Sequence, residues 1–314
     1  MEFGYYIRPA DTYEGMVEMA RYAEELGLSG VFLNDHVHSM RQGGMEPYLE
    51  AWTAIAGIGV QTSRIRLGHI VLFNSLRNPA FLAKSVSTLD RMSGGRYELI
   101  IGAGWNEPEY VGYDLMERGR GMPSPRERVD RLKEALQILR GMFDNDVFSY
   151  EGRYWTLRDA INLPPPLQRP MRISVGANKP RMIRIAAKYA DGLNNGGGLD
   201  TLREVRGTLV PALERSMKRL DDYYFSGFAA QVTVNKSEDE YDAMAKRIAE
   251  RSKRSVEDVK GDVFSGTAEV LVEKFRVAED LGVKMMVVYV RPATTVEEMK
   301  ERLSEFRDEV MRQL

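Results

Sequence analysis

The sequence predicts an α/β protein folded as a (β/α)8 TIM barrel. Apolar, strand-like runs alternate with amphipathic helices along the chain, and about eight such units fit into 314 residues. The main alternative for this alternation is an open, doubly wound sheet. No GxGxxG motif follows a predicted strand, so the barrel is the preferred architecture.

Eight apolar segments are predicted to be strands. Each is short, rich in branched or aromatic residues, and bounded by polar or turn-forming residues. In chain order they are residues 3–7, 31–33, 65–73, 97–101, 172–175, a short one at Leu193, 228–234 and 285–290.

The helices are predicted from a unit in which an amphipathic helix ends at a small residue and a strand follows at once. In "YAEELGLSGVFLND" the helix ends near Gly27, and "AAKYADGLNN" and "VAEDLGVKMMVVYV" repeat the arrangement. Ser237 with Glu240, and Thr295 with Glu298, have the spacing of capping boxes at two helix starts.

The proline-rich stretch "LPPPLQRP", residues 163–170, has the composition of an interdomain linker. The segments on both sides of it nevertheless continue one strand–helix alternation. We therefore expect a loop inside a single domain that spans residues 1–314.

The composition favours small-molecule chemistry. A net charge of −2 gives no broad attraction to nucleic acid or to an anionic membrane. The absence of cysteine excludes disulfides, thiolate catalysis and cysteine-ligated metals. The N-terminus has no signal-peptide pattern, and no apolar run is long enough to span a bilayer. We expect a cytoplasmic protein that acts on a small-molecule substrate.

Small and polar residues follow the predicted strands, at the ends that a barrel brings together on one rim. Active sites of such barrels lie on that rim. Solvated loops also contain Gly and Asn, so only the combination of several groups predicts a site. The groups are Asn34, Asp35 and His36; Phe73, Asn74 and Ser75; and residues 104–107, 176–178 and 194–198.

The stretch "FLNDHVHSM" raises the question of a metal site, because His36 and His38 have HxH spacing. A barrel metallohydrolase would draw further histidines from later strands. The remaining histidine, His69, lies inside a predicted strand, and no HExxH motif or carboxylate-rich loop compensates. We expect no metal, and His36 becomes a candidate acid or base.

Two further stretches indicate binding or proton transfer. In "ISVGANKPRM" the turn at Gly176 precedes Pro180, which suits a first helical position, so free amides could hold a phosphate. An ordinary tight turn is the alternative. In "GAGWNEPEY" two carboxylates, Glu107 and Glu109, follow a buried strand beside Trp105, where a carboxyl could exchange a proton.

The stretch "RNPAFLAKSVSTLDRMSGGRYELIIGAGWNEPEY" resembles the bacterial-luciferase-like flavin and deazaflavin oxidoreductases. "PSPRERVDRLKEALQIL", "EGRYWTL" and "AAKYADGLN" resemble later stretches of the same family. Within it, the chain is most similar to the branch that uses the deazaflavin coenzyme F420. The resemblance implies a barrel with loop insertions at its C-terminal face, a homodimer or higher homo-oligomer, and a cofactor ring across the barrel mouth.

The resemblance also implies roles for residues of the second and third strands. Asp35 would help to hold the cofactor ring, and His36 would face its reacting edge. The bond Ile70–Val71 matches a non-prolyl cis peptide that forms a bulge behind the ring. Phe73 matches a position at the hydrogen-bonding edge of the ring, where phenylalanine offers only its backbone.

Later strand ends supply the other residues that the resemblance implies. Glu107 matches the acid of deazaflavin-dependent sugar-phosphate dehydrogenases and is, with His36, a predicted proton carrier. The remaining predicted cofactor contacts are Trp105, Asn106, Tyr110, Gly176, Ala177, Asn178, Asn195 and Gly196; Met40, Trp105 and Tyr110 are predicted to line the substrate pocket.

Departures from the family pattern bear on the substrate. Met40 stands where the sugar-phosphate enzymes have a tryptophan, and Leu199 where they have a phosphate-binding lysine. Residues 4–6 lack the first-strand glutamate of methylene-tetrahydromethanopterin reductases. We expect hydride transfer between F420 and an unidentified apolar or amphipathic molecule. The alternatives are an FMN-dependent two-component monooxygenase and a cofactor-binding protein without turnover.

Overall fold

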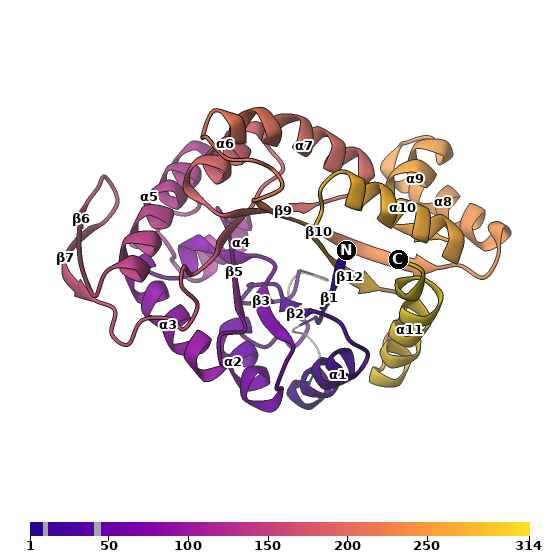
Figure 1. Ribbon diagram of the computed structural model, residues 1–314, viewed down its shortest axis with the longest axis horizontal. Coiled ribbons are helices and arrows are strands. Elements are labelled where there is room, and N and C mark those ends of the chain that lie inside the picture. The colour runs from indigo at the N-terminus through magenta and orange to yellow at the C-terminus, as the bar shows by residue number, and fades with distance from the viewer. Residues whose placement is uncertain (9–11, 41–44) are drawn as a thin grey trace.

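The computed structural model describes residues 1–8, 12–40 and 45–314. Within these residues, eight parallel strands close into a barrel, since β9 pairs back onto β10. The predicted (β/α)8 barrel is confirmed, and helices surround it (Figure 1). In spatial order the barrel strands are β10 (Tyr224–Val234), β12 (Met285–Val290), β1 (Glu2–Tyr6), β2 (Gly30–Leu33), β3 (Arg66–His69), β5 (Tyr97–Gly102), β8 (Ile173–Gly176) and β9 (Gly192–Gly196).

Other short strands lie outside this circuit. β4 (Leu72–Phe73) continues β3 and pairs with β5, and β11 (Ser265–Gly266) pairs in parallel with the last residues of β10. β6 (Val147–Glu151) and β7 (Thr156–Ile161) form an antiparallel hairpin that projects from the ring of helices (Figure 1). This hairpin was not predicted, because apolar residues at its ends remain more than half exposed and leave no core-facing pattern.

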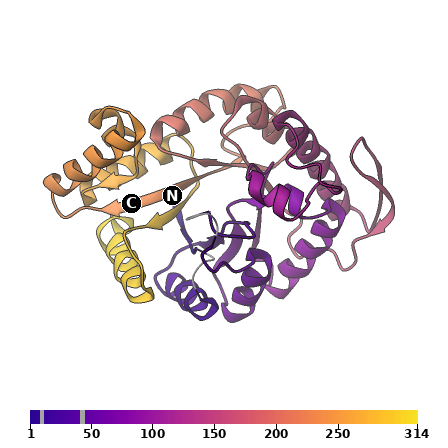
Figure 2. The same ribbon diagram turned by 180° about the vertical axis from the view of Figure 1, so that it is seen from behind.

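The helices cover the outer face of the barrel, and Figure 2 shows the same ring from behind. No helix in the described part of the chain is both long enough and apolar enough to cross a membrane. The helices are α1 (Tyr13–Glu25), α2 (Ala51–Gln61), α3 (Pro79–Met92), α4 (Glu107–Gly112), α5 (Pro125–Asp144), α6 (Pro180–Tyr189), α7 (Leu199–Glu214), α8 (Glu238–Ser252), α9 (Val256–Asp262), α10 (Ala268–Asp280) and α11 (Val296–Glu309), with short 3-10 turns η2 (Asn74–Leu76) and η3 (Met311–Gln313).

The two predicted capping boxes differ in outcome. Thr295 and Glu298 form both reciprocal bonds at the start of α11, so this capping box is confirmed. At the start of α8, Ser237 accepts from the backbone N–H of Glu240. The Glu240 carboxylate instead accepts from the backbone of Lys236, so the second box is only half formed.

The proline-rich stretch 163–170 is a loop between β7 and β8, and the barrel strands before and after it pair with each other. The buried carboxylate of Asp90 on α3 holds this loop. Its Oδ2 accepts from the backbone N–H groups of Leu167 at 2.8 Å and Gln168 at 3.0 Å. The predicted loop is confirmed; the single domain over residues 1–314 stays a prediction.

The barrel interior is filled at one level by the ring of Phe32. Glycines on three neighbouring strands make room for it, because a Cβ on Gly4, Gly30 or Gly68 would lie 2.7, 2.8 or 2.7 Å from atoms of that ring. Protein interiors are close-packed, so a methyl group at any of these positions would require the ring to move.

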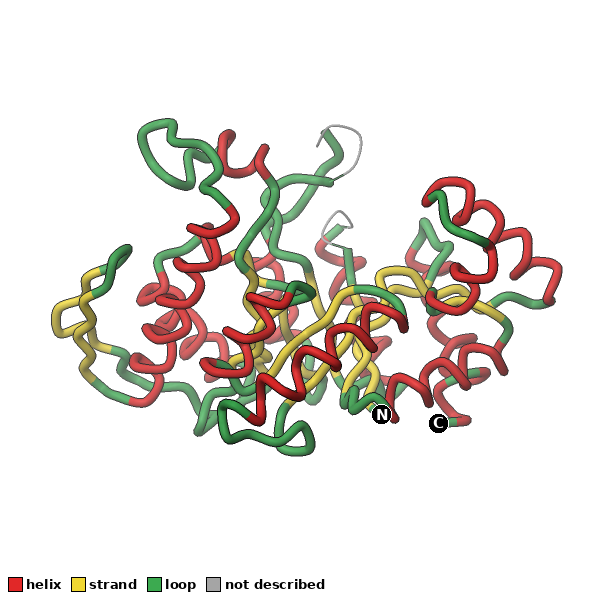
Figure 3. Tube along the Cα trace, turned by 90° about the horizontal axis from the view of Figure 1, so that it is seen from above, coloured by secondary structure: helices red, strands yellow, loops and turns green. Residues whose placement is uncertain are grey.

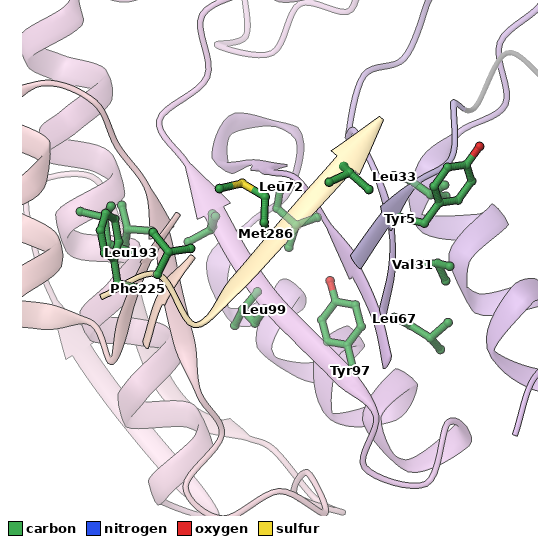
Figure 4. Close-up of a cluster of buried hydrophobic side chains, with 14 of the residues drawn as sticks. Tyr5, Val31, Leu33, Leu67, Leu72, Tyr97, Leu99, Leu193, Phe225 and Met286 are labelled. Atoms are coloured by element: carbon green, nitrogen blue, oxygen red, sulfur yellow. The ribbon is translucent and has the colours of Figure 1, made fainter. Parts of the chain in front are cut away.

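A second apolar layer lies between the strands and the helices. Strand side chains alternate between the two faces of the sheet, so every second residue points outward. Figure 4 shows this cluster, in which the labelled residues are Tyr5, Val31, Leu33, Leu67, Leu72, Tyr97, Leu99, Leu193, Phe225 and Met286, each at most 1% exposed.

Charged residues occupy the N-terminal end of the barrel. Arg66 Nη1 lies 3.0 Å from Glu98 Oε1, and Arg172 pairs with the same carboxylate. The guanidinium of Arg172 also lies over the ring of Tyr224, 3.6 Å from its centroid. In Figure 3 the long loops rise at the opposite end, away from both termini.

His69 lies on β3, as the sequence predicted, and is completely buried. Its ring stacks on Trp52 with centroids 5.5 Å apart, and its Nδ1 lies 2.9 Å from the phenol of Tyr97. Burial away from water lowers the pKa of His69 to about 4, because the charged imidazolium is disfavoured there.

We expect this histidine to make stability depend on pH. As pH falls from about 6.5 towards about 4, only the unfolded chain binds the His69 proton, so the free energy of unfolding should fall by up to about 3 kcal/mol. His69→Phe keeps a stacking ring and cannot titrate. Urea denaturation across this pH range should give a shallower slope for His69→Phe than for the control His38→Phe; equal slopes would contradict the assignment.

Candidate active site

The predicted rim residues surround a cavity of about 310 Å³ at the C-terminal end of the barrel, here called the first cavity. Strands β2, β5, β8 and β9, together with β4, end around it. Most of the predicted cofactor contacts line it, and so does His36. The lining contacts are Asp35, Ile70, Val71, Phe73, Trp105, Gly176, Ala177, Asn178 and Gly196.

Three predicted cofactor contacts lie behind that lining. Tyr110 is fully buried, and its ring packs against Phe73 with centroids 5.1 Å apart. Asn106 is buried and donates to the sulfur of Met40 at 3.4 Å. Asn195 is also buried and lines neither this cavity nor its neighbour. These residues support the lining, and their direct contact with a cofactor stays a prediction, as does contact of Tyr110 with substrate.

The wall of the first cavity contains a cis peptide bond between Ile70 and Val71, at the place that the resemblance implied. The Val71 side chain lies between two glycines. A Cβ on Gly102 would lie 2.7 Å from Cγ2 of Val71, and one on Gly176 would lie 2.8 Å from its Cγ1. The absence of a side chain at both glycines therefore leaves room for Val71 in the cavity wall.

Asp35 ties two rim segments together. Its carboxylate is 2% exposed and accepts from the backbone N–H of Phe73 at 2.8 Å. Arg77 donates to both of its oxygens, at 2.6 and 3.0 Å, and to Glu50 at 2.7 Å. Asp35 thus fixes the end of β2 against β4. It also fixes the position of the Phe73 backbone, which lines the first cavity.

His36 is held by a buried carboxylate from α4. Its Nδ1 lies 3.1 and 2.9 Å from the two oxygens of Glu109, whose side chain is 0% exposed. Glu109 Oε1 also accepts from the backbone N–H of Val37 at 2.8 Å. The edge of the His36 ring meets Trp105, with centroids 5.9 Å apart. The imidazole is therefore oriented from two sides.

Glu109 remains charged in this position. Burial alone would raise the pKa of Glu109, but the hydrogen bond and charge of His36 and the Val37 amide lower it below the ordinary value. A carboxylate that accepts from Nδ1–H favours the imidazole tautomer in which Nε2 carries no proton.

Glu107, the predicted proton carrier of this segment, has an exposed side chain in the first turn of α4 and lines neither cavity. The sequence places Glu109 beside Glu107 but predicts no specific role for it. Helical spacing could have predicted the burial of Glu109, because Glu109 and Tyr110 lie three and four residues after Asn106 and share one buried face with it. Glu107 lies on another face of the helix. The role of Glu107 stays a prediction, and Glu109 is the better placed partner for His36.

A second cavity of about 510 Å³ adjoins the first and shares His36, Ile70, Trp105 and Phe228 with it. Met40, predicted to face the substrate, lines the second cavity, as does Trp105. His36 and Trp105 therefore stand between two spaces that are large enough for small molecules.

The turn after β8 is built as the sequence predicted, since Pro180 begins α6. Asn178 holds this turn against the next strand. Its Oδ1 accepts from Asn195 Nδ2 at 3.0 Å and from the backbone N–H of Gly196 at 3.2 Å. Gly176 and Ala177 line the first cavity beside the start of a helix, a position where free amides bind anions.

Neither of the other two histidines lines the first or the second cavity. Nδ1 of His38 lies 3.0 Å from the carbonyl oxygen of Ser39, and His38 lines neither cavity. His69 is enclosed in the outer layer of the barrel. Among the described residues, no three His, Cys, Asp or Glu side chains are arranged to hold a metal ion.

Comparison with known sequences gives a match to one family model. The luciferase-like monooxygenase family matches residues 1–312. An F420-dependent glucose-6-phosphate dehydrogenase of Kineococcus radiotolerans is 33% identical over 209 residues, which cover 65% of this chain and 58% of that protein. The match thus spans less than two thirds of the relative's length.

Solved structures with low sequence identity have the same fold. An F420-dependent secondary alcohol dehydrogenase in complex with an F420-acetone adduct has a TM-score of 0.81 and 18% identity, covering 99% of this chain and 98% of that chain. Monooxygenase RslO1 from Streptomyces bottropensis has a TM-score of 0.79 and 18% identity, covering 100% and 99%. At these identities the likeness shows the fold alone.

We expect the hydrogen bond from Phe73 to Asp35 and the ion pair between Asp35 and Arg77 to contribute measurably to stability. Asp35→Asn keeps an acceptor for the Phe73 amide but removes the charge opposite Arg77, which should cost roughly 1.5 to 3 kcal/mol of unfolding free energy. The control, Glu50→Gln, removes the charge of the more exposed partner of Arg77 and one of the two oxygens that accept from the Trp52 and Thr53 amides at the start of α2, so it should cost about 1 kcal/mol. Urea denaturation of both variants measures the difference, and equal losses would contradict a special role for Asp35.

Proposed function

Because the chain belongs to the luciferase-like monooxygenase family, we propose that it is a coenzyme-F420-dependent oxidoreductase that moves a hydride between this cofactor and a small-molecule substrate. The observation that carries the proposal is the position of His36, held by the buried Glu109 on the wall shared by two cavities. A proton carrier between two adjoining binding spaces is what a coupled hydride and proton transfer requires.

The residues of the first cavity fit a flavin-like cofactor. The oxygens Oδ1 of Asn74 and Asn195 are buried without a hydrogen-bond partner in the described part of the chain. These residues adjoin Phe73 and Gly196, which line the cavity, so a ligand with N–H or hydroxyl donors would complement this region. The glycine turn at the start of α6 suits the phosphate of the same ligand.

When bound, F420 would accept or donate a hydride, and the protein would then have to take up or supply the accompanying proton. Glu109 holds the Nδ1 side of the imidazole, which leaves Nε2 of His36 to exchange that proton with a substrate oxygen. Asp35, through Phe73, and the Ile70–Val71 segment would hold the cofactor side of the site.

The first prediction concerns the cofactor itself. Equilibrium dialysis of the purified protein should show F420 binding at least about tenfold tighter than FMN. The alternative function is an FMN-dependent two-component monooxygenase, which tighter FMN binding would favour. If neither cofactor binds, the proposal fails. The predicted homodimer or higher homo-oligomer stays a prediction.

The second prediction separates the two glutamates. Glu109→Gln keeps the shape of the side chain but removes the charge facing His36, so turnover should fall by about 10- to 100-fold while F420 affinity changes less than about threefold. The ¹⁵N shifts of the His36 ring should also show a mixture of tautomers. Glu107→Gln, on the exposed face of α4, should lower turnover less than about threefold. A larger loss for Glu107→Gln would restore the assignment made from the sequence.

A further inference from the structure

The second cavity has a wall of aromatic rings from the end of β1, from the middle of β10 and from the end of β12. Tyr6 packs against Phe228 with centroids 5.5 Å apart and edge-on against Tyr289 at 4.9 Å. Trp105 lines the same cavity. Rings that pack on one another present a fixed apolar surface, which suits a hydrocarbon ligand better than one with many hydroxyl groups to satisfy.

Asn34 places an amide in the lining of this cavity. Its Oδ1 accepts from the phenols of Tyr6 at 2.8 Å and Tyr48 at 2.7 Å. Its Nδ2 has no hydrogen-bond partner among residues 1–8, 12–40 and 45–314. The two phenols therefore orient the side chain and leave its donor end for a ligand. Asn34 and His36 both line the second cavity, so the donor and the proton carrier face one space.

The second cavity offers little charge for a phosphate group. Among the described residues that line it, Arg8 is the only cation, and its Nη1 lies 3.5 Å from Glu46 Oε2. The same carboxylate oxygen accepts from the hydroxyl of Ser39 at 2.9 Å. Phosphate sites usually combine several charge-assisted donors.

We infer that the second cavity binds a neutral, mainly hydrocarbon ketone or secondary alcohol, whose oxygen accepts a hydrogen bond from Asn34 Nδ2. This inference rests on the proposed function and names its substrate class. Oxidation of the alcohol transfers a hydride from carbon to the cofactor and the hydroxyl proton to His36, leaving the ketone. Reduction reverses both transfers. The aromatic wall contacts the hydrocarbon part, and Asn34 fixes which carbon is presented for reaction.

The test uses acetophenone, a neutral aromatic ketone, and glucose 6-phosphate as probes of the full chain. Equilibrium dialysis with and without F420 should show saturable binding of acetophenone and no saturable binding of glucose 6-phosphate at matched concentrations. Only acetophenone, or the corresponding alcohol in the other direction, should be turned over by the F420-loaded protein.

Variants at Asn34 test the hydrogen bond. Asn34→Asp keeps oxygen acceptors for both phenols and replaces the amide donor with a carboxylate oxygen, so acetophenone should bind about tenfold more weakly without F420. Tyr48→Phe removes one of the bonds that orient Asn34 and should weaken binding by about threefold. Asn145→Asp, an exposed position after α5, adds the same charge outside both cavities and should leave binding unchanged.

Each result bears on one of the two proposals. Glucose 6-phosphate binding as tight as acetophenone binding, no acetophenone binding, or an Asn34→Asp affinity within about twofold of the wild type would overturn the substrate class. If any one of these three results is obtained while F420 binds tightly, the proposed function still stands. If acetophenone binds with the expected Asn34 effect but F420 does not bind, the proposed function fails and the ligand class of the cavity stands.

Discussion

The candidate site depends on one buried ionic interaction, between Asp35 and Arg77. Asp35 lies at the end of β2 and also binds the backbone of β4, so two strand ends cannot move independently. Arg77 extends the interaction outward, because it pairs with Glu50 at the start of α2 and lies over the ring of Trp52. Trp52 in turn stacks on His69. The wall of the first cavity is thus continuous with the packing between the barrel and α2.

Glu109 is the second buried carboxylate at the rim, and its surroundings differ in one respect. Asp35 faces a guanidinium that always carries a charge, whereas Glu109 faces an imidazole that can gain or lose a proton. Both carboxylates also accept from backbone amides, which reduces the cost of their burial. The first pair therefore joins two strand ends of the cavity wall, and the second pair fixes the orientation of the His36 ring in that wall.

Much of the fold was predictable because the barrel strands are buried on both faces and leave continuous apolar runs. The β6–β7 hairpin was not, since Val147 and Ile161 are more than half exposed. At the site, the positions of Asp35 and His36 followed from strand ends and family resemblance. The contacts of Glu109 and Asn34 depend on which face of a short helix or strand end is covered, and this is decided by tertiary packing.

Trp105 lines both cavities and is 63% exposed, and it is one of three tryptophans in the chain. Trp52 packs against His69, and Trp155 lies in the turn between β6 and β7; neither lines these cavities. Indole emission responds to whatever replaces water at the ring. The chain therefore carries an intrinsic fluorescent reporter at the boundary between its two binding spaces, where occupancy of either space should alter the light emitted by one residue.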